Sequence, residues 1–349
     1  MTDLSKLFQH QVQDAINQRH SLQIIGSNSK SFYGGKTKTN QHLLTADHQG
    51  IIDYEPSELV ITARAGTTVT QINSLLNDHQ QMLGFEPPKF GALASLGGTM
   101  ACGFSGSRRP FTGSARDFTL GCKILNGHGE IVNFGGRVMK NVAGFDVSRL
   151  MVGALGSLGV LLEVSLRVLP IPEAELSLSF DCSETAAIAK MAALSAQPWP
   201  LSGLAYDGQR LKLRLAGAES AVKSAAQQLG GDLETNVNDF WLALGEQQLD
   251  FFQQAGDLWR ISLAPASPPL NLAGSSILDW GGGLRWLKTE QTAAEVHAAI
   301  AEAGGHAIAF RSGQKTDWIR FDPALLAIQQ QLRQAFDPWR IFNPGRLLD

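Results

Sequence analysis

Apolar side chains in the first half of the chain follow helical and strand spacings in turn. A repeat of three to four residues predicts amphipathic helices over residues 4–18 and 68–79. Runs rich in β-branched and other apolar residues predict strands over residues 22–25, 51–54, 58–63, 118–125, 131–134 and 160–169. Pro170 and Pro172 close the last run, and proline is excluded from central strands. We therefore expect a first domain over residues 1–172.

The same two spacings continue beyond that point. Helices are predicted over residues 184–195, 218–229, 236–249 and 291–303. Strands are predicted over residues 176–180, 201–206, 210–215, 258–263, 276–280 and 283–287. This mixture indicates a second, α+β domain over residues 173–335, followed by a C-terminal tail over residues 336–349.

Glycine changes this picture, because many of the 36 glycines fall in short clusters. The clusters lie at residues 26–31, 95–106 and 152–162. Glycine permits positive φ angles and close approach of backbone N–H groups to a phosphate. The GxGxxG pattern is absent and no Gly directly precedes Lys30, so a Rossmann turn and a P-loop are disfavoured. Each cluster alone could be a tight packing site, whereas three in one domain favour loops that line a ligand.

Charge and cysteine content exclude several classes of function. The formal net charge is −3, with Lys and Arg dispersed, so nucleic acid is not expected as a partner. The three cysteines, Cys102, Cys122 and Cys182, form no CxxC pattern and no disulfide framework. Redox chemistry would therefore need an organic cofactor. With no secretory signal and no apolar run long enough to span a bilayer, we expect a soluble cytoplasmic protein.

Five motifs occur in one order along the chain. They are Gly26-Ser27-Asn28-Ser29, Ser95-Leu96-Gly97-Gly98, Gly113-Ser114-Ala115-Arg116-Asp117 with Leu120-Gly121, Lys140-Asn141-Val142-Ala143-Gly144-Phe145-Asp146, and Gly156-Ser157-Leu158-Gly159-Val160. This order resembles the FAD-linked oxidases with a vanillyl-alcohol-oxidase-type (PCMH-type) flavin domain, over residues 20–172 and 343–346. The resemblance implies an α+β fold, with a two-subdomain PCMH-type FAD-binding domain followed by a smaller, ferredoxin-like α+β cap domain.

The same resemblance implies a cofactor site. The loop of residues 26–31 would surround the FAD diphosphate, and Gly159 and Val160 would lie along the flavin end. Asn343 and Arg346 match a tail motif that commonly ends in Lys and returns to the flavin. The full set of implied cofactor contacts is Gly26, Ser27, Asn28, Ser29, Lys30, Ser31, Ser95, Gly97, Gly98, Cys102, Gly103, Gly106, Ser114, Arg116, Gly159, Val160, Asn343 and Arg346.

Departures from the family pattern bear on how FAD is held. Residues 21–41 contain no His or Cys, so the first-loop histidine that attaches flavin covalently in relatives is missing, and non-covalent FAD is implied. Cys102 lies in the second glycine cluster, where a small packing thiol is expected rather than an attachment point. Arg116, with Arg108 and Arg109, either contacts an anionic group or belongs to a solvated loop that pairs with Asp117.

Other departures bear on chemistry. Relatives that oxidise D-2-hydroxy acids carry a C-terminal metal-binding cluster, whereas here only His297 and His306 lie in that region, nine residues apart. We therefore expect no metal site. Phe145 stands where relatives commonly carry Tyr, which removes a phenolic hydroxyl. No residue is assigned a catalytic role.

Segments 26–32, 108–110 and 278–282 resemble the smaller flavin-binding subunits of bacterial glycolate oxidases. That resemblance implies a subunit of a complex that oxidises glycolate to glyoxylate. A larger flavin dehydrogenase subunit would carry the substrate site, and an iron–sulfur subunit would pass electrons to the respiratory chain. The complex could then lie on the inner face of the membrane through its other subunits. Two alternatives stay open: a self-contained FAD-dependent oxidase or dehydrogenase of a small hydroxy acid, and a non-redox interaction subunit with an empty flavin site.

Overall fold

The computed structural model describes residues 2–136, 147–312 and 318–348, and by its internal packing the chain divides into two compact units. Unit 1 comprises Met1–Ser105, Gly113–Ile171 and Phe321–Asp349, and unit 2 comprises Gly106–Thr112 and Pro172–Arg320. Residues 106–112 pack with unit 2, although the expected boundary at 172 would place them in the first domain. The helix at Pro323–Phe336 packs with unit 1, although the expected boundary at 335 would place it in the second domain. Those boundaries stay predictions about domains.

Unit 1 is built on a five-stranded antiparallel sheet in the order β3-β4-β8-β6-β7. Its strands are β3 (Ile51–Glu55), β4 (Val60–Arg64), β6 (Thr119–Leu125), β7 (Ile131–Gly135) and β8 (Val160–Arg167). Burial alternates along β8 at its start, as expected for a strand with two differently covered faces. Two small pairs flank this sheet, β1 (Gln23–Ile25) with β2 (His42–Leu44) and β5 (Gln81–Met82) with β9 (Leu169–Pro170).

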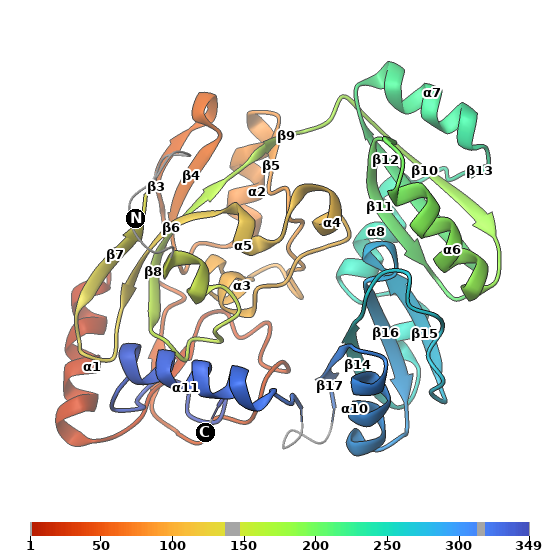
Figure 1. Cartoon of the computed structure of the whole chain (residues 1–349). Helices are drawn as coiled ribbons and strands as arrows, with labels where there is room; N and C mark the ends of the chain where they lie inside the picture. Colours follow the sequence, from red (N-terminus) through yellow and green to blue (C-terminus); the bar gives the residue numbers. More distant parts are fainter. Residues whose placement is uncertain (1, 137–146, 313–317, 349) are drawn as a thin grey trace. The chain divides into compact units, whose positions relative to one another are not determined.

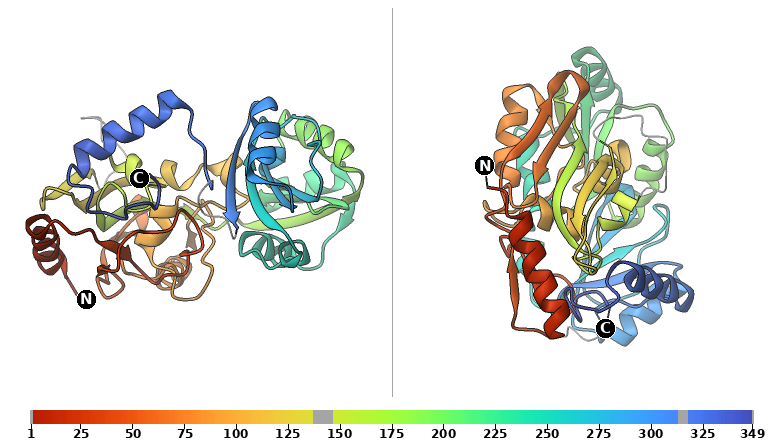
Figure 2. Two further views of the ribbon diagram at one scale, coloured as in Figure 1. Left: turned by 90° about the horizontal axis from the view of Figure 1, so that it is seen from below. Right: turned by 90° about the vertical axis from the view of Figure 1, so that its left-hand side faces the viewer.

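Helices cover the sheet of unit 1 with apolar faces (Figure 1). α2 (Val69–Asp78) begins with a capping box at Thr68 and buries Val69, Ile72 and Leu76. α1 (Ser5–Gln18) lies lengthwise beside the strands, and its buried Phe8 and Val12 belong to one cluster with residues of β6 and β8 (Figure 2). The other helices described in unit 1 are α3 (Leu96–Cys102), α5 (Ala115–Phe118), α11 (Pro323–Phe336), and two 3-10 helices at Pro56–Glu58 and Val147–Met151.

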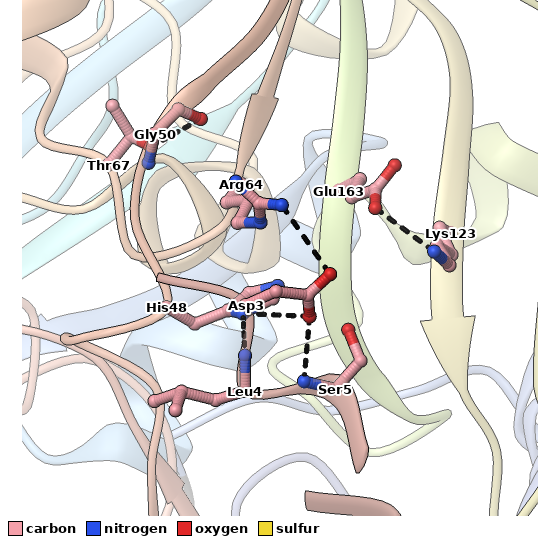
Figure 3. A network of polar contacts seen from close by, with 9 residues as sticks. All are labelled: Asp3, Leu4, Ser5, His48, Gly50, Arg64, Thr67, Lys123 and Glu163. Atoms are coloured by element: carbon pink, nitrogen blue, oxygen red, sulfur yellow. Dashed lines mark hydrogen bonds and ion pairs between the residues drawn. The ribbon is translucent and has the colours of Figure 1, made fainter. Parts of the chain in front are cut away.

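A polar network fastens the start of α1 to the sheet (Figure 3). The Asp3 carboxylate accepts a hydrogen bond from the backbone N–H of Ser5 at 2.9 Å and lies 3.4 Å from the Arg64 guanidinium on β4. His48 is fully buried, and its Nδ1 accepts from the backbone N–H of Leu4 at 3.0 Å. The backbone of the helix start is therefore held by side chains that titrate.

Unit 2 contains an eight-stranded antiparallel sheet in the order β13-β10-β12-β11-β15-β16-β14-β17. Its strands are β10 (Ala174–Asp181), β11 (Leu201–Tyr206), β12 (Arg210–Gly217), β13 (Asp232–Leu233), β14 (Asp257–Ser262), β15 (Ser275–Asp279), β16 (Leu284–Thr289) and β17 (His306–Arg311). Each half has its four strands in the order fourth, first, third, second along the chain. This is the strand order of a ferredoxin-like unit, so the sheet consists of two such halves joined at β11 and β15.

The two halves differ in their helices. In the first half α6 (Glu184–Ser195) follows β10 and α7 (Glu219–Leu229) follows β12, and both pack on one face (Figure 1). α8 (Val237–Gly245) covers the opposite face, where its Trp241 Nε1 donates to Ser177 Oγ at 2.9 Å. In the second half, α10 (Ala293–Glu302) follows β16, whereas β14 and β15 are joined by a segment with three prolines, which cannot continue a helix. Unit 2 also contains the short α4 (Arg109–Thr112), α9 (Asp250–Gln253) and a 3-10 helix at Trp280–Gly282.

The predicted α+β class, with a ferredoxin-like second domain, is confirmed by this architecture and by the comparisons below. Two longer elements were not predicted: β17, whose buried positions include the small Ala307 and Ala309, and α11, in which Arg333 is the buried residue among those described. The short elements β2, β5, β13, α3, α4, α5 and α9 were not predicted either. Within the described residues, no helix is both long enough and apolar enough to span a membrane.

Candidate functional site

The loop after β1 forms the first wall of a cavity in unit 1. Residues 26–31 leave the strand through Gly26, whose ideal Cβ would lie only 2.5 Å from Ser95 Oγ, and Asn28 has a positive φ of 62°. Asparagine tolerates that left-handed conformation better than most residues. The sequence therefore permits a tight loop whose backbone faces the second glycine cluster.

The second wall is the start of α3. Ser95 Oγ accepts from the backbone N–H of Gly98 at 3.3 Å, which caps the helix. At Gly97 an added Cβ would meet the Ala65 Cβ at 2.8 Å, so only glycine lets α3 lie this close to the end of β4. Close packing on one side of α3 thus accompanies the cavity on the other.

The third wall is the segment that leads into β8. Gly156 has a φ of 71°, and an added Cβ there would lie 2.6 Å from the side-chain nitrogen of Asn343. Gly159 has a φ of 151°, and its Cβ would lie 2.9 Å from the carbonyl oxygen of Leu125. Both glycines are needed for backbone geometry.

The C-terminal tail closes the arrangement. The Asn343 side chain donates to Leu155 O at 2.7 Å and accepts from the Ile24 N–H at 2.7 Å. The Arg346 guanidinium donates to Lys30 O at 3.1 Å and to Ser31 O at 3.2 Å. The C-terminal tail therefore contacts both the first wall of the cavity, at Ile24 and residues 30–31, and the third wall, at Leu155.

These walls enclose a cavity whose empty space of about 790 Å³ includes open solvent. Many of the predicted cofactor contacts line it, namely Gly26, Ser27, Asn28, Ser29, Lys30, Ser31, Ser95, Gly97, Gly98, Cys102, Gly159, Asn343 and Arg346. The structure thus brings glycine motifs that are far apart in sequence to one cavity.

The remaining predicted contacts lie elsewhere, and their cofactor role stays a prediction. Gly103 ends α3 with a left-handed φ of 66°, and Val160 is fully buried in β8. Ser114 shares a capping box with Asp117, whose carboxylate accepts from its backbone N–H and hydroxyl, while the Arg116 side chain is exposed. Gly106 lies in unit 2, where its carbonyl accepts from Trp280 Nε1 at 2.9 Å.

Sequence patterns missed several lining residues. These are Gln23, Ile24, Ile25, Thr37, Thr45, Ala65, Ala101, Leu155, Gly156 and Leu161. Most are strand or strand-end positions that reach the cavity only because β1 pairs with β2 and β4 with β8. Gly156 belongs to the fifth glycine motif, which is the signal in the sequence that points to this additional lining residue.

The charges around the cavity favour an anionic ligand. Lys30 and Arg346 both line it, and among the described residues that line it none carries a carboxylate. Lys30 is only 5% exposed, and its ammonium donates to Lys89 O at 3.0 Å. Two cations near converging backbone loops suit a diphosphate, which accepts charge-assisted hydrogen bonds. The donor set and the close glycine packing therefore fit an FAD diphosphate.

Cys102 lies in the same lining with a different character. Burial raises the pKa of the Cys102 thiol to about 11, although Lys30 and Arg346 nearby oppose that shift. A thiol with such a pKa stays protonated near neutral pH, and the thiolate is the nucleophilic form. Burial therefore disfavours the nucleophilic thiolate form of Cys102.

Two further sequence observations concern other regions. The Lys140–Asp146 motif, with Phe145, falls in residues 137–146, which lie outside the described residues. In the ranges that the structure describes, no group of three or more His, Cys, Asp and Glu side chains could hold a metal ion. His297 lies in α10 and contacts Trp259 edge to face, with ring centroids 5.1 Å apart.

Comparison with known proteins supports the assignment of the fold. Residues 8–135 match the family described as FAD binding domain. Alkyldihydroxyacetonephosphate synthase has a similar solved structure, with a TM-score of 0.67 over 96% of this chain and 73% of that chain at 14% identity. This likeness concerns the fold alone, and it extends across both units.

Sequence relatives are more specific. The glycolate oxidase subunit GlcE of Escherichia coli (strain K12) is 47% identical over 345 residues, which is 99% of this chain and 97% of the relative. The glycolate oxidase subunit GlcD of Bacillus subtilis (strain 168) is 34% identical over 86 residues, 25% of this chain and 18% of the relative. With the near-complete match to GlcE and the FAD-binding family in its first unit, the chain belongs to the GlcE family of glycolate oxidase subunits, within the FAD-dependent oxidoreductases.

Proposed function

We propose that this chain is the FAD-binding subunit of a glycolate oxidase complex. The observation that carries the proposal is the cavity of unit 1, where three glycine segments, the tail and two cations meet without a lining carboxylate among the described residues. When bound here, FAD would supply a redox centre that relays electrons or supports the complex, while glycolate would be oxidised to glyoxylate at the flavin of a partner subunit. The residues of this chain would bind and orient it.

The roles of individual residues follow from their chemistry. Backbone N–H groups of residues 26–31 would hold the diphosphate, with Lys30 contributing positive charge. Gly97 and Gly159 would keep these wall segments close to their neighbours, since an added Cβ would meet Ala65 Cβ at 2.8 Å and Leu125 O at 2.9 Å. The predicted contacts at Gly103, Gly106, Ser114, Arg116 and Val160 are kept as part of this proposal.

We propose that FAD is bound without a covalent link. Residues 21–41 contain neither His nor Cys. Cys102, the cysteine in the lining, has a pKa raised by burial to about 11 and so lacks the thiolate needed for attack. Acid precipitation of the purified yellow protein should leave FAD in the supernatant. Flavin that stays with the pellet would contradict the non-covalent proposal.

Partner subunits complete the proposed function. The relatives named GlcE and GlcD are each called a subunit of glycolate oxidase. We propose that a larger, GlcD-type flavin subunit carries the substrate site, and that an iron–sulfur subunit passes electrons onward to the respiratory chain. The chain would work in the cytoplasm, reaching the inner face of the membrane only through these partners.

One experiment separates this proposal from its alternatives. The chain is purified alone and with a co-expressed GlcD-type subunit and iron–sulfur subunit, and FAD content and glycolate-dependent dye reduction are measured. FAD in the isolated chain with turnover only in the complex would support the proposal. Turnover by the isolated chain would favour a self-contained oxidase or dehydrogenase. A folded but colourless chain that binds no added FAD would favour an interaction subunit with an empty flavin site.

A further inference from the structure

We infer that Asn343 is a positioning residue, which fixes the separation of two walls of the FAD cavity and makes the C-terminal tail a working part of the cofactor site. The inference rests on the proposed function. It concerns geometry and hydrogen bonding of the described residues, and it assigns Asn343 no contact with the reacting atoms.

Both ends of the Asn343 side chain are used. Its NH₂ group donates to Leu155 O at 2.7 Å, in the wall that leads into β8. Its carbonyl oxygen accepts from the Ile24 N–H at 2.7 Å, in the strand that feeds the loop of residues 26–31. The side chain is 5% exposed, so each of these backbone groups would be left unsatisfied without it.

Asparagine alone among the small polar residues meets these demands. The position needs a donor and an acceptor on one short planar group, which an amide has and a carboxylate lacks. Its φ of 43° is left-handed, a region that asparagine enters more easily than most side chains. The neighbouring Gly156 leaves room, since a Cβ there would lie 2.6 Å from the Asn343 nitrogen.

Hydrogen bonds to Leu22 and Asp337 fix the backbone of the tail just before and at Asn343. The Asn343 N–H donates to Leu22 O at 2.9 Å, and Phe342 forms a parallel bridge with Leu22. The fully buried Asp337 accepts from the N–H groups of Ile341 at 2.9 Å and Phe342 at 3.0 Å. Asn343 is therefore presented by a rigid segment, which is what a spacer between two walls requires.

Arg346 extends the same function to the loop. Its N–H donates to Asn343 O at 3.0 Å, which forms a tight turn, and its guanidinium donates to the carbonyls of Lys30 and Ser31. The rigid fork of arginine can bond both carbonyls at once, whereas lysine offers one point charge. The tail thus restrains the loop of residues 26–31 at its start and at its end.

The test uses Asn343→Asp, which keeps size and one acceptor but loses the donor to Leu155 O. FAD affinity of the cofactor-free chain is measured by flavin fluorescence titration, together with the visible flavin spectrum and the unfolding temperature without FAD. Asn236→Asp is the matched control, because Asn236 is exposed and makes no side-chain capping bond at the start of α8.

We expect Asn343→Asp to raise the FAD dissociation constant roughly tenfold, as when a buried group loses its partner. The flavin spectrum should shift toward that of free FAD, while the control binds as the wild type does. FAD affinity within twofold of wild type in Asn343→Asp would overturn the inference. If that variant does not fold, Arg346→Lys decides: a severalfold weaker FAD affinity supports the inference, and wild-type affinity overturns it.

Failure of the proposed function looks different. If the wild-type chain takes up no FAD, amide exchange of residues 22–35 is compared between Asn343→Ala and Asn236→Ala without cofactor. Faster exchange in Asn343→Ala alone would keep the positioning role while the FAD proposal falls. Equal exchange in the two variants would overturn the positioning role as well.

Discussion

The two units of this protein bury cationic side chains in opposite ways. In unit 1, Lys30 and Arg346 line a cavity and hold its loops together. In unit 2, Arg214 donates to Ser202 and stacks on Trp241, and Arg285 donates to the carbonyls of Ser267 and Pro268. The comparison teaches that a buried arginine indicates a ligand site only where space remains beside it.

Glycines show the same contrast. An added Cβ would meet Ala65 Cβ at 2.8 Å at Gly97 in unit 1, and Trp241 ring atoms at 2.8 Å at Gly203 in unit 2. Both glycines permit close approach, but Gly97 also lines the cavity whereas Gly203 gives its space to an indole ring. Glycine clusters therefore predict close packing first, and a cofactor only in combination.

The largest expected effect concerns a buried arginine of unit 2, which lines no cofactor cavity in the described residues. Arg285 is fully buried, so Arg285→Ala would leave a cavity and orphan two carbonyls of the proline-rich segment. We expect a loss of about 3 kcal/mol in unfolding free energy, measured by urea denaturation, with FAD affinity per folded molecule unchanged. A selective loss of FAD affinity instead would break the distinction between the two units.

A smaller effect is expected in the cavity wall of unit 1. Gly97→Ala would push α3 away from Ala65, and overpacking of this kind costs about 1–3 kcal/mol. Because Gly97 lines the cavity, we expect the loss chiefly as weaker FAD binding in fluorescence titrations. Gly245→Ala is the matched control, since an added Cβ there meets nothing within 4 Å. Equal FAD affinity in both variants would argue against α3 as a cofactor wall.

Acid should loosen unit 1 through His48. Burial lowers the pKa of His48 from its ordinary 6.5, so the unfolded chain binds the proton more readily and stability falls as pH drops below about 6.5. The hydrogen bond from the backbone N–H of Ser5, with the Ser5 side chain nearby, holds the pKa of Asp3 down at about 2 instead of 3.8, so its contribution disappears between those values. His48→Gln should flatten the upper part of the pH profile of unfolding. An unchanged slope would contradict this role.

The smallest expected effect concerns an ion pair on the sheet of unit 1. Lys123 and Glu163 face each other across β6 and β8 at 3.1 Å and are partly exposed. Such pairs contribute less than about 1 kcal/mol, so Glu163→Gln should shift the unfolding temperature by only a few degrees at low salt and less in high salt. A large, salt-independent shift would mean that the pair is buried more deeply than its exposure indicates.

Much of the fold could be predicted from sequence, because apolar spacing reports burial directly. Helix 184–195 and strand 201–206 have the predicted bounds. α11 packs on unit 1 through Leu332 and Phe336, but its apolar Leu325 and Ile328 are exposed, so its apolar positions do not define a single buried face. β17 was missed because its buried alanines weaken the strand signal.

The candidate site was predictable only in part, for a related reason. Glycine and serine motifs report local backbone needs, which is why the loop of residues 26–31 and Gly97 were found. Thr45 and Ala65 carry no such local signal, and they line the cavity because strands distant in sequence pair beside it. Such contributions depend on tertiary pairing, which spacing along one sequence does not encode.

The junction inside the large sheet has a mechanical consequence. β11 and β15 share the single registered pair Tyr206↔Leu278, whereas β10 and β12 are matched over eight pairs. Under partial denaturation, β11 and β15 should therefore separate before the strand pairs within either half of the sheet lose their hydrogen bonds. Each released piece would then expose an unpaired strand edge, which is where a neighbouring molecule could add on and start aggregation.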